Sequence, residues 1–80
     1  MNKISTFDCH GLTYQKVQDD LLNWIFTEYN KGNELHIITG NSDTMKKIVV
    51  KMLDENCFDW RFPIDNNGMI KIIWEGYNQK

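Results

Sequence analysis

A carboxylate and an imidazole stand two residues apart near the amino terminus, in the segment Phe7-Asp8-Cys9-His10-Gly11. Because alternate side chains of an extended strand point to the same face, Asp8 and His10 are predicted to share one side and Cys9 to take the other. A carboxylate beside an imidazole orients the ring and raises its pKa, which suits a general acid or base near neutral pH. The same two side chains also suit a divalent cation such as Mg²⁺ or Mn²⁺, with water completing its shell.

The same pair also has a purely structural interpretation. An aspartate at a strand end can accept hydrogen bonds from the amides of the following turn, and a histidine in this position can cap the helix that comes next. The sequence leaves both interpretations open. A second polar cluster meeting Asp8 and His10 in space would favour the functional one.

Such a cluster, Thr39-Gly40-Asn41-Ser42, follows the run Leu-His-Ile-Ile, whose near-continuous apolarity predicts a strand buried on both faces. The amides that open a helix have no acceptor within the helix, so they bind anions readily. The Thr39 hydroxyl and the amides from Gly40 to Ser42 are therefore candidate ligands for a phosphate. Asn41 and Ser42 also form an ordinary helix-start signal together with Asp43, and phosphate contact is their second interpretation.

The balance of charge limits what kind of nucleic-acid site the chain can carry. Nine basic residues stand against eleven acidic ones, which gives a net charge of -2. This excludes a strongly cationic protein that coats nucleic acid through bulk charge, and leaves only a local site. Lys46 and Lys47, in the first turns of the second predicted helix, form either a solvated face or a short phosphate track beside that site.

Six elements must position these groups, and the apolar pattern predicts them in the order β-α-β-α-β-β. The predicted strands are Ile4 to Asp8, Leu35 to Thr39, Phe58 to Phe62 and Met69 to Trp74. The predicted helices run from Tyr14 to about Tyr29, after the N-cap Thr13, and from Ser42 or Asp43 to Asn56. The first has an apolar stripe made of Tyr14, Val17, Leu21, Trp24, Ile25 and Tyr29. The first two strands are expected to be parallel, because a helix connects them, and the last two form an antiparallel hairpin around Asp65-Asn66-Asn67-Gly68.

This arrangement brings the two polar clusters together. The carboxyl ends of adjacent parallel strands lie at one edge of the sheet, where ligand sites form in open α/β sheets. We therefore expect Asp8 and His10 to converge with Thr39 and Gly40, although they are far apart along the chain. An acid, an imidazole, a hydroxyl and an anion-accepting helix start together suit a phosphate-bearing substrate.

The other sulfur and ring-nitrogen groups are assigned to structure. Cys9 and Cys57 are predicted to be small buried hydrophobic residues, and His36 a hydrogen-bonded histidine within the sheet. No CxxC or HxxxH spacing supports a zinc site, so no metal ligands are assigned. Trp60 is predicted to pack in the core rather than to offer a stacking face to a base.

The length and composition describe a single domain over residues 1–80. The hydrophobic fraction is 41% and the charged fraction 25%, which is ordinary for a globular protein. No apolar run is long enough to span a membrane, and the amino terminus lacks the apolar stretch of a signal peptide. We therefore expect a cytoplasmic protein with no membrane partner.

The two motifs and their order resemble the Smr (small MutS-related) domain family. In that family a strand ends in Leu-Asp-x-His-Gly, a Thr starts the next helix, and a later strand ends in a Thr/His-Gly-x-Gly loop. This chain has Phe7-Asp8-Cys9-His10-Gly11-Leu12-Thr13 and Thr39-Gly40-Asn41-Ser42. The resemblance covers nearly the whole chain. It implies an α/β two-layer sandwich with a four-stranded mixed sheet and two helices, similar in layout to the C-terminal domain of translation initiation factor three.

Smr domains are associated with endonuclease activity on DNA or RNA, so the resemblance implies a nucleic-acid-binding domain that cleaves phosphodiester bonds. By position, Asp8 and His10 take the place of the acidic and imidazole pair, and Thr39 and Gly40 the start of the loop. Ser42 stands where the second glycine of the loop is usual. That departure and the net negative charge favour the alternative, a catalytically inactive Smr-like module that binds nucleic acid or a protein partner. A Mg²⁺ or Mn²⁺ cofactor is expected only if the domain is an endonuclease.

Overall fold

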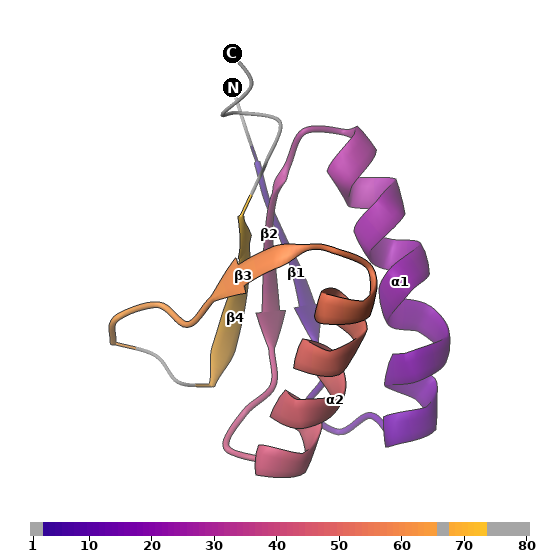
Figure 1. Ribbon diagram of the computed structural model, residues 1–80, viewed down its shortest axis with the longest axis vertical. Helices are drawn as coiled ribbons and strands as arrows, with labels where there is room; N and C mark the ends of the chain where they lie inside the picture. Colours follow the sequence, from indigo (N-terminus) through magenta and orange to yellow (C-terminus); the bar gives the residue numbers. More distant parts are fainter. Residues whose placement is uncertain (1–2, 66–67, 74–80) are drawn as a thin grey trace.

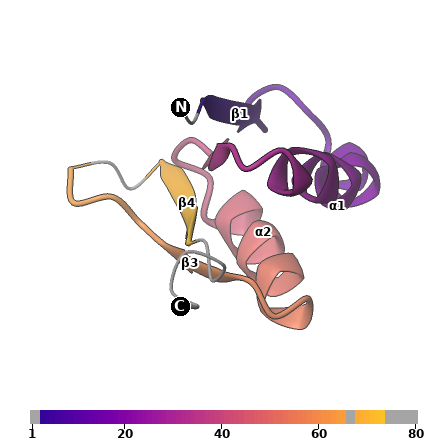
Figure 2. The ribbon, with the colours of Figure 1, turned by 90° about the horizontal axis from the view of Figure 1, so that it is seen from above.

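Two helices cover one face of a four-stranded sheet in the computed structural model, which describes residues 3–65 and 68–73 (Figure 1). The elements follow the predicted order: β1 (Ile4–Asp8), α1 (Tyr14–Asn30), β2 (Glu34–Ile38), α2 (Asp43–Glu55), β3 (Asp59–Arg61) and β4 (Met69–Ile73). Seen from above, α1 and α2 lie side by side against the same face of the sheet (Figure 2). The predicted α/β two-layer sandwich is confirmed.

The strands are ordered β1-β2-β4-β3 across the sheet. β1 and β2 are parallel, whereas β4 pairs antiparallel with both β2 and β3. The predicted parallel pair and hairpin are therefore confirmed. β3 is shorter than the predicted strand because the Phe58 amide donates to the Leu53 carbonyl at 2.9 Å and closes α2 instead of joining the sheet. Asn66, Asn67 and Trp74 lie outside the described residues.

Both helices begin at the residues that the sequence predicts. The Thr13 hydroxyl accepts a hydrogen bond from the Lys16 amide at 3.1 Å, and the Ser42 hydroxyl accepts one from the Met45 amide at the same distance. Each cap satisfies an amide that has no acceptor inside its helix. Gly32, with a φ of +80°, follows the end of α1 in the left-handed conformation that glycine adopts without strain.

The hydrophobic core lies between the helices and the sheet. α1 contributes one residue from each of three successive turns, as does α2, and β2 and β4 contribute alternate residues. The fully buried members are Val17, Leu21 and Ile25 of α1, Val49 and Leu53 of α2, Leu35 and Ile37 of β2, and Ile70 and Ile72 of β4. The sequence predicted that β2 would be buried on both faces. The face turned away from the helices is only half-buried, because both helices cover the other side of the sheet.

The two cysteines differ in their surroundings. Cys9 is buried, as predicted, but Cys57 is exposed, so that prediction was wrong. The reason is the end of α2, where the Cys57 amide donates to Asp54 and the next amide donates to Leu53. This hydrogen-bond pattern places Cys57 at a left-handed position, with a φ of 63°, where helices commonly have glycine.

Trp60 packs partly against the core, and its indole Nε1 donates to Asp54 Oδ1 at 2.9 Å. The predicted core position is thus half right, because the nitrogen end of the ring remains at the surface and finds a partner there. None of the helices in the described part of the chain is long and apolar enough to cross a bilayer.

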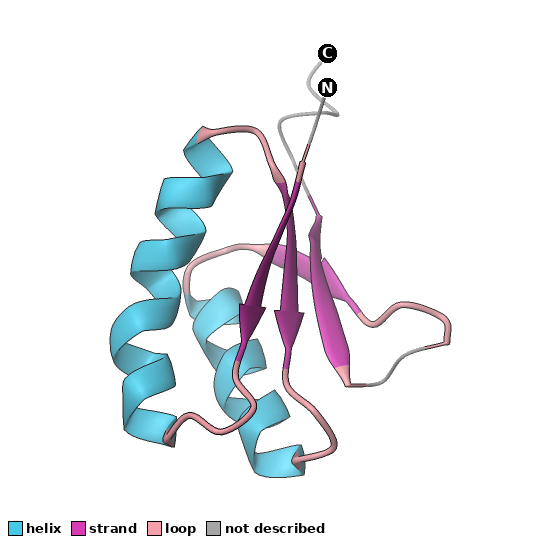
Figure 3. Ribbon diagram, turned by 180° about the vertical axis from the view of Figure 1, so that it is seen from behind, coloured by secondary structure: helices cyan, strands magenta, loops and turns pink. Residues whose placement is uncertain are grey.

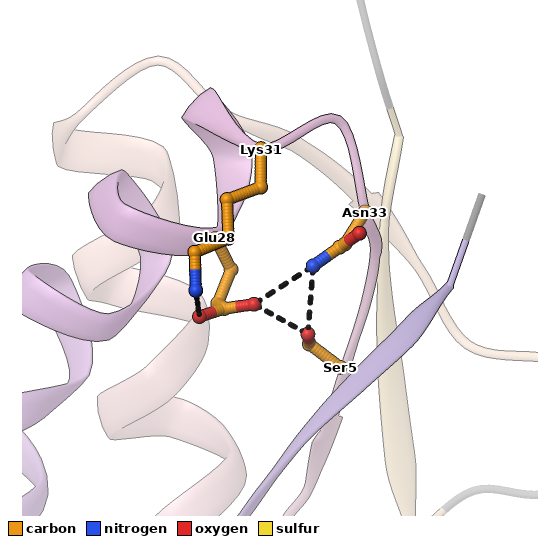
Figure 4. Close-up of polar contacts among 4 residues, drawn as sticks. All are labelled: Ser5, Glu28, Lys31 and Asn33. Carbon is orange, nitrogen blue, oxygen red and sulfur yellow. Dashed lines mark hydrogen bonds and ion pairs between the residues drawn. The ribbon is translucent and has the colours of Figure 1, made fainter. Parts of the chain in front are cut away.

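A cluster of polar side chains ties the carboxyl end of α1 to β1 (Figure 4). Glu28 Oε1 accepts from the Ser5 hydroxyl at 2.6 Å and from the Asn33 amide group at 2.9 Å, while Lys31 Nζ donates to Oε2 at 3.2 Å. These hydrogen bonds lower the pKa of Glu28 to about 2, with the Ser5 hydroxyl as the largest cause. The amino end of β1 is therefore fixed by a fully bonded carboxylate.

Candidate functional site

β1 and β2 both end on the side where both helices begin, so the two predicted motifs meet there (Figure 3). Between the two loops lies a hollow of about 310 Å³. It is lined by Cys9, His10, Gly11, Leu12 and Tyr14 from the first loop and by Thr39, Gly40, Asn41, Ser42 and Met45 from the second. Sequence positions thirty residues apart thus share one cavity because parallel strands align their ends.

Two glycines give the loops their sharp turns. Gly11 has a φ of +83° and Gly40 a φ of +69°, both in the left-handed region that other residues rarely adopt. The Cys9 amide still donates to the Ile38 carbonyl at 2.8 Å, which holds the first loop beside the second. Each loop therefore turns sharply soon after its strand ends, and a space remains between the two helix starts.

Asp8 does not orient the His10 ring. Asp8 Oδ1 accepts a hydrogen bond from the His10 backbone amide at 2.9 Å, which is the structural interpretation that the sequence left open. β1 ends at Asp8 and His10 belongs to the following turn, so the strand alternation predicted for the pair stops before His10. His10 lines the hollow, whereas Asp8 is exposed and does not.

Thr39 and the Gly40 amide are occupied by the protein itself. The Thr39 hydroxyl donates to the Gly40 and Gly68 carbonyls, both at 3.2 Å. The Gly68 carbonyl also accepts from the Thr39 and Gly40 amides, at 2.7 and 3.0 Å. These groups therefore tie the second loop to the start of β4, and their amides are not free to donate to a phosphate. The Thr39 oxygen retains only acceptor capacity toward a ligand.

Donors left without a partner in the described part of the protein belong instead to the helix starts. Thr13 and Ser42 cap only one amide each, so the first amides of both helices keep no acceptor within the helix. These are the amides of Tyr14 and Gln15 in α1 and of Asp43 and Thr44 in α2. Of these four residues, Tyr14 lines the hollow, and Asp43 directly follows the lining residue Ser42. The positive ends of two helix dipoles therefore lie at the edge of the hollow, which favours a bound anion.

Charged side chains around the hollow are few. Asp43 places one carboxylate in the first turn of α2. Lys46 is half-buried and Lys47 exposed, and neither belongs to the lining. The lysine track predicted beside the site therefore begins outside the hollow. Among the described residues that line the hollow, the exposed His10 is the one with an imidazole side chain, and none is a lysine or arginine.

Cys9 lines the hollow, but its buried thiol is poorly suited to act as a nucleophile. Burial raises the pKa of Cys9 to about 11, and the negative charge of Asp8 adds to the shift. The thiol is therefore protonated at neutral pH. Within residues 3–65 and 68–73, no three His, Cys, Asp or Glu side chains are grouped so as to hold a metal ion.

Two residues of the rim were missed by the sequence analysis. Tyr14 was assigned to the apolar stripe of the first helix, yet it is 47% exposed and lines the hollow. Leu12, in the turn before the helix, is 36% exposed. Tyr14 is the first residue after the N-cap, and this position was a usable signal. The first turn of a helix that begins at the edge of a sheet extends beyond the sheet, so its side chains are less covered than those of later turns.

Comparison with known proteins found no matching family model, no matching curated protein and no matching solved structure. A function of the chain is therefore inferred from its own residues and their geometry.

Proposed function

We propose that the chain is an Smr-like nucleic-acid-binding domain that holds a backbone phosphate in the hollow between the His10 and Gly40 loops. The observation that carries this proposal is the meeting of two helix starts and an exposed imidazole around one cavity of about 310 Å³. Amide donors and helix dipoles both favour an anion of the phosphate type.

The modest charge of the chain fits a site of this kind. With a net charge of -2, the protein binds nucleic acid through a few directed hydrogen bonds and not through a broad cationic surface. Few phosphates are then neutralised by lysine or arginine, so the affinity falls only gently as salt rises.

Endonuclease activity is the second candidate function, and the exposed His10 imidazole favours it. This ring lies at the hollow and can act as general acid or base on a bound phosphodiester. The bond between Asp8 and the His10 amide favours binding without cleavage, because the carboxylate holds the turn and not the ring. An adaptor for a protein partner is a further alternative if nucleic acid does not bind.

The test measures binding and nicking of branched DNA and structured RNA, with and without Mg²⁺ or Mn²⁺. We expect His10→Ala to weaken binding about tenfold, since it removes a hydrogen-bond donor to phosphate. His36→Ala is the matched control: it removes the other histidine of the chain, which lies in β2 and bonds to Glu34 at 2.7 Å.

The outcomes separate the candidates. Nicking by the wild type, lost in His10→Ala and kept in His36→Ala, supports the endonuclease. Binding without nicking supports the binding module. If neither nucleic acid binds at low salt, the proposal is wrong and a pull-down for protein partners is the next experiment.

A further inference from the structure

The Tyr14 ring occupies an unusual place for an aromatic side chain. It is 47% exposed at the first position of α1, a full turn before Val17, the first buried residue of the helix. Most other rings of the described residues are paired: Phe7 with Trp24, Tyr29 and Phe26 with Phe58, and Trp60 with Phe62. Within that part of the chain, Tyr14 makes no such ring contact, and it is one of the residues that line the hollow.

The same hollow thus combines two kinds of surface. The helix starts offer amide donors to a phosphate, while Tyr14, Leu12 and the buried Met45 offer apolar area. A nucleotide has the matching combination, a phosphate joined to a flat base. Aromatic side chains bind bases by stacking, and they accept any base because each has a π face.

We infer that Tyr14 stacks on an unpaired base of the strand whose phosphate the hollow holds, so that the site takes single-stranded nucleic acid in preference to duplex. In a duplex both faces of a base are covered by its neighbours, and a protein ring can reach it only after unstacking. This inference rests on the proposed function, because the phosphate site brings the base to the ring.

The test compares an oligothymidylate with a fully abasic deoxyribose-phosphate oligomer of the same length, using the full chain at low salt and fluorescence anisotropy. We expect the wild type to bind the oligothymidylate about tenfold more tightly than the abasic oligomer. Tyr14→Ala removes the ring but keeps the backbone amide, so it should lower the affinity for the oligothymidylate to that for the abasic oligomer. Tyr14→Phe keeps the ring and should bind as the wild type does.

Phe26→Ala is the matched control, since Phe26 lies on the same helix with 50% of its surface exposed and does not line the hollow. It should leave the difference between the two oligomers unchanged. Tyr14→Leu replaces Tyr14→Ala if the alanine variant fails to fold. An oligouridylate and a thymidine–adenine duplex complete the series, to distinguish RNA from DNA and single strand from duplex.

Equal affinity of the wild type for the two oligomers would overturn the stacking role, and so would an equal loss for both in Tyr14→Ala. Duplex binding as tight as that of the single strand would also overturn it. If the abasic oligomer binds and the base adds nothing, the phosphate site stands alone. If neither oligomer binds, the proposed function itself fails.

Discussion

The two ends of the β1–β2 pair are both rich in polar groups, but they use them differently. At the amino end, Glu28 accepts hydrogen bonds from Ser5, Asn33 and Lys31, and Ser5 and Asn33 also bond to each other (Figure 4). At the carboxyl end, the caps and Gly68 satisfy only part of the donors, and both helices start beside a hollow that Tyr14 and Ser42 line.

This comparison distinguishes polar groups that are paired within the protein from polar groups that remain available to a ligand. A buried or half-buried polar group is stabilising when it is paired within the protein, and a paired group has little left to offer a substrate. Residue type alone does not show this distinction, because serine, asparagine and an ionisable side chain occur at both ends. It depends on which donors have found acceptors.

Acidification should have the largest effect on stability, through the Glu28 cluster at the amino end of the β1–β2 pair. The pKa of Glu28 is lowered from about 4.5 in the unfolded chain to about 2 in the fold, so its stabilising contribution is complete above the unfolded pKa and is lost as the pH falls toward 2. The pKa of Glu34 is also lowered, chiefly by its bond to His36, so protonation of Glu34 at low pH also destabilises the fold. Thermal unfolding should show the Tm of the wild type falling through this range.

Glu28→Gln identifies the contribution of Glu28. Its Tm should lie well below that of the wild type near neutral pH, and the gap should narrow as the pH falls toward 2. Glu55→Gln, at the exposed carboxyl end of α2, is the control and should show no such convergence. A gap that stays constant with pH would contradict the bonded state of the Glu28 carboxylate.

Removal of a neutral member of the same cluster should have the next largest effect. Asn33→Ala deletes the donor to Glu28 Oε1 and to the Ser5 hydroxyl, at 2.9 and 3.2 Å. Hydrogen bonds to a charged group contribute more than those between neutral groups, so we expect the free energy of unfolding, measured with urea, to fall clearly below that of the wild type. Nucleic-acid binding by the folded variant should be unchanged, and weakened binding would break the distinction between the two ends.

Thr39→Val tests the opposite assignment at the carboxyl end. Valine has the shape of threonine without the hydroxyl that donates to the Gly40 and Gly68 carbonyls. The expected loss of stability is about 1 kcal/mol, since a buried hydroxyl and its bonds are removed together. If Thr39 is structural, phosphate affinity stays within about twofold of the wild type; a larger loss in a binding titration would return Thr39 to the ligand set.

The smallest expected effect is a gain in stability at the end of α2. α1 is followed by Gly32 in the left-handed conformation, whereas α2 is followed by Cys57 in that conformation. Cys57→Gly removes this backbone strain, but glycine also gives the unfolded chain more conformational entropy, which offsets part of the gain. The net expected effect is a stabilisation of about 0.5 kcal/mol. Gly32→Ala is the reciprocal variant and should destabilise it by about 1 kcal/mol. A loss of stability in Cys57→Gly would show that the thiol makes a favourable contribution here.

Much of the fold could be predicted because it depends on neighbours along the chain. The caps Thr13 and Ser42, the apolar spacing of Val17, Leu21 and Ile25, and the alternation in β4 are local patterns that tertiary contacts did not override. The prediction that two loops converge is also topological, since it needs only a parallel pair of strands. The errors at Cys57 and on the outer face of β2 concern what covers a residue, which local spacing does not report.

The sequence by itself determined the six elements, their order and the edge of the sheet where the two motifs meet. The tertiary structure decided which groups at that edge remain available: Gly68, 29 residues from Thr39, takes the hydroxyl and amides of the second loop. It also left Tyr14 exposed at the rim. The physical reason is that a hydrogen bond or a covering layer from a distant segment arises only when the chain has packed, whereas caps and periodicity act within one turn.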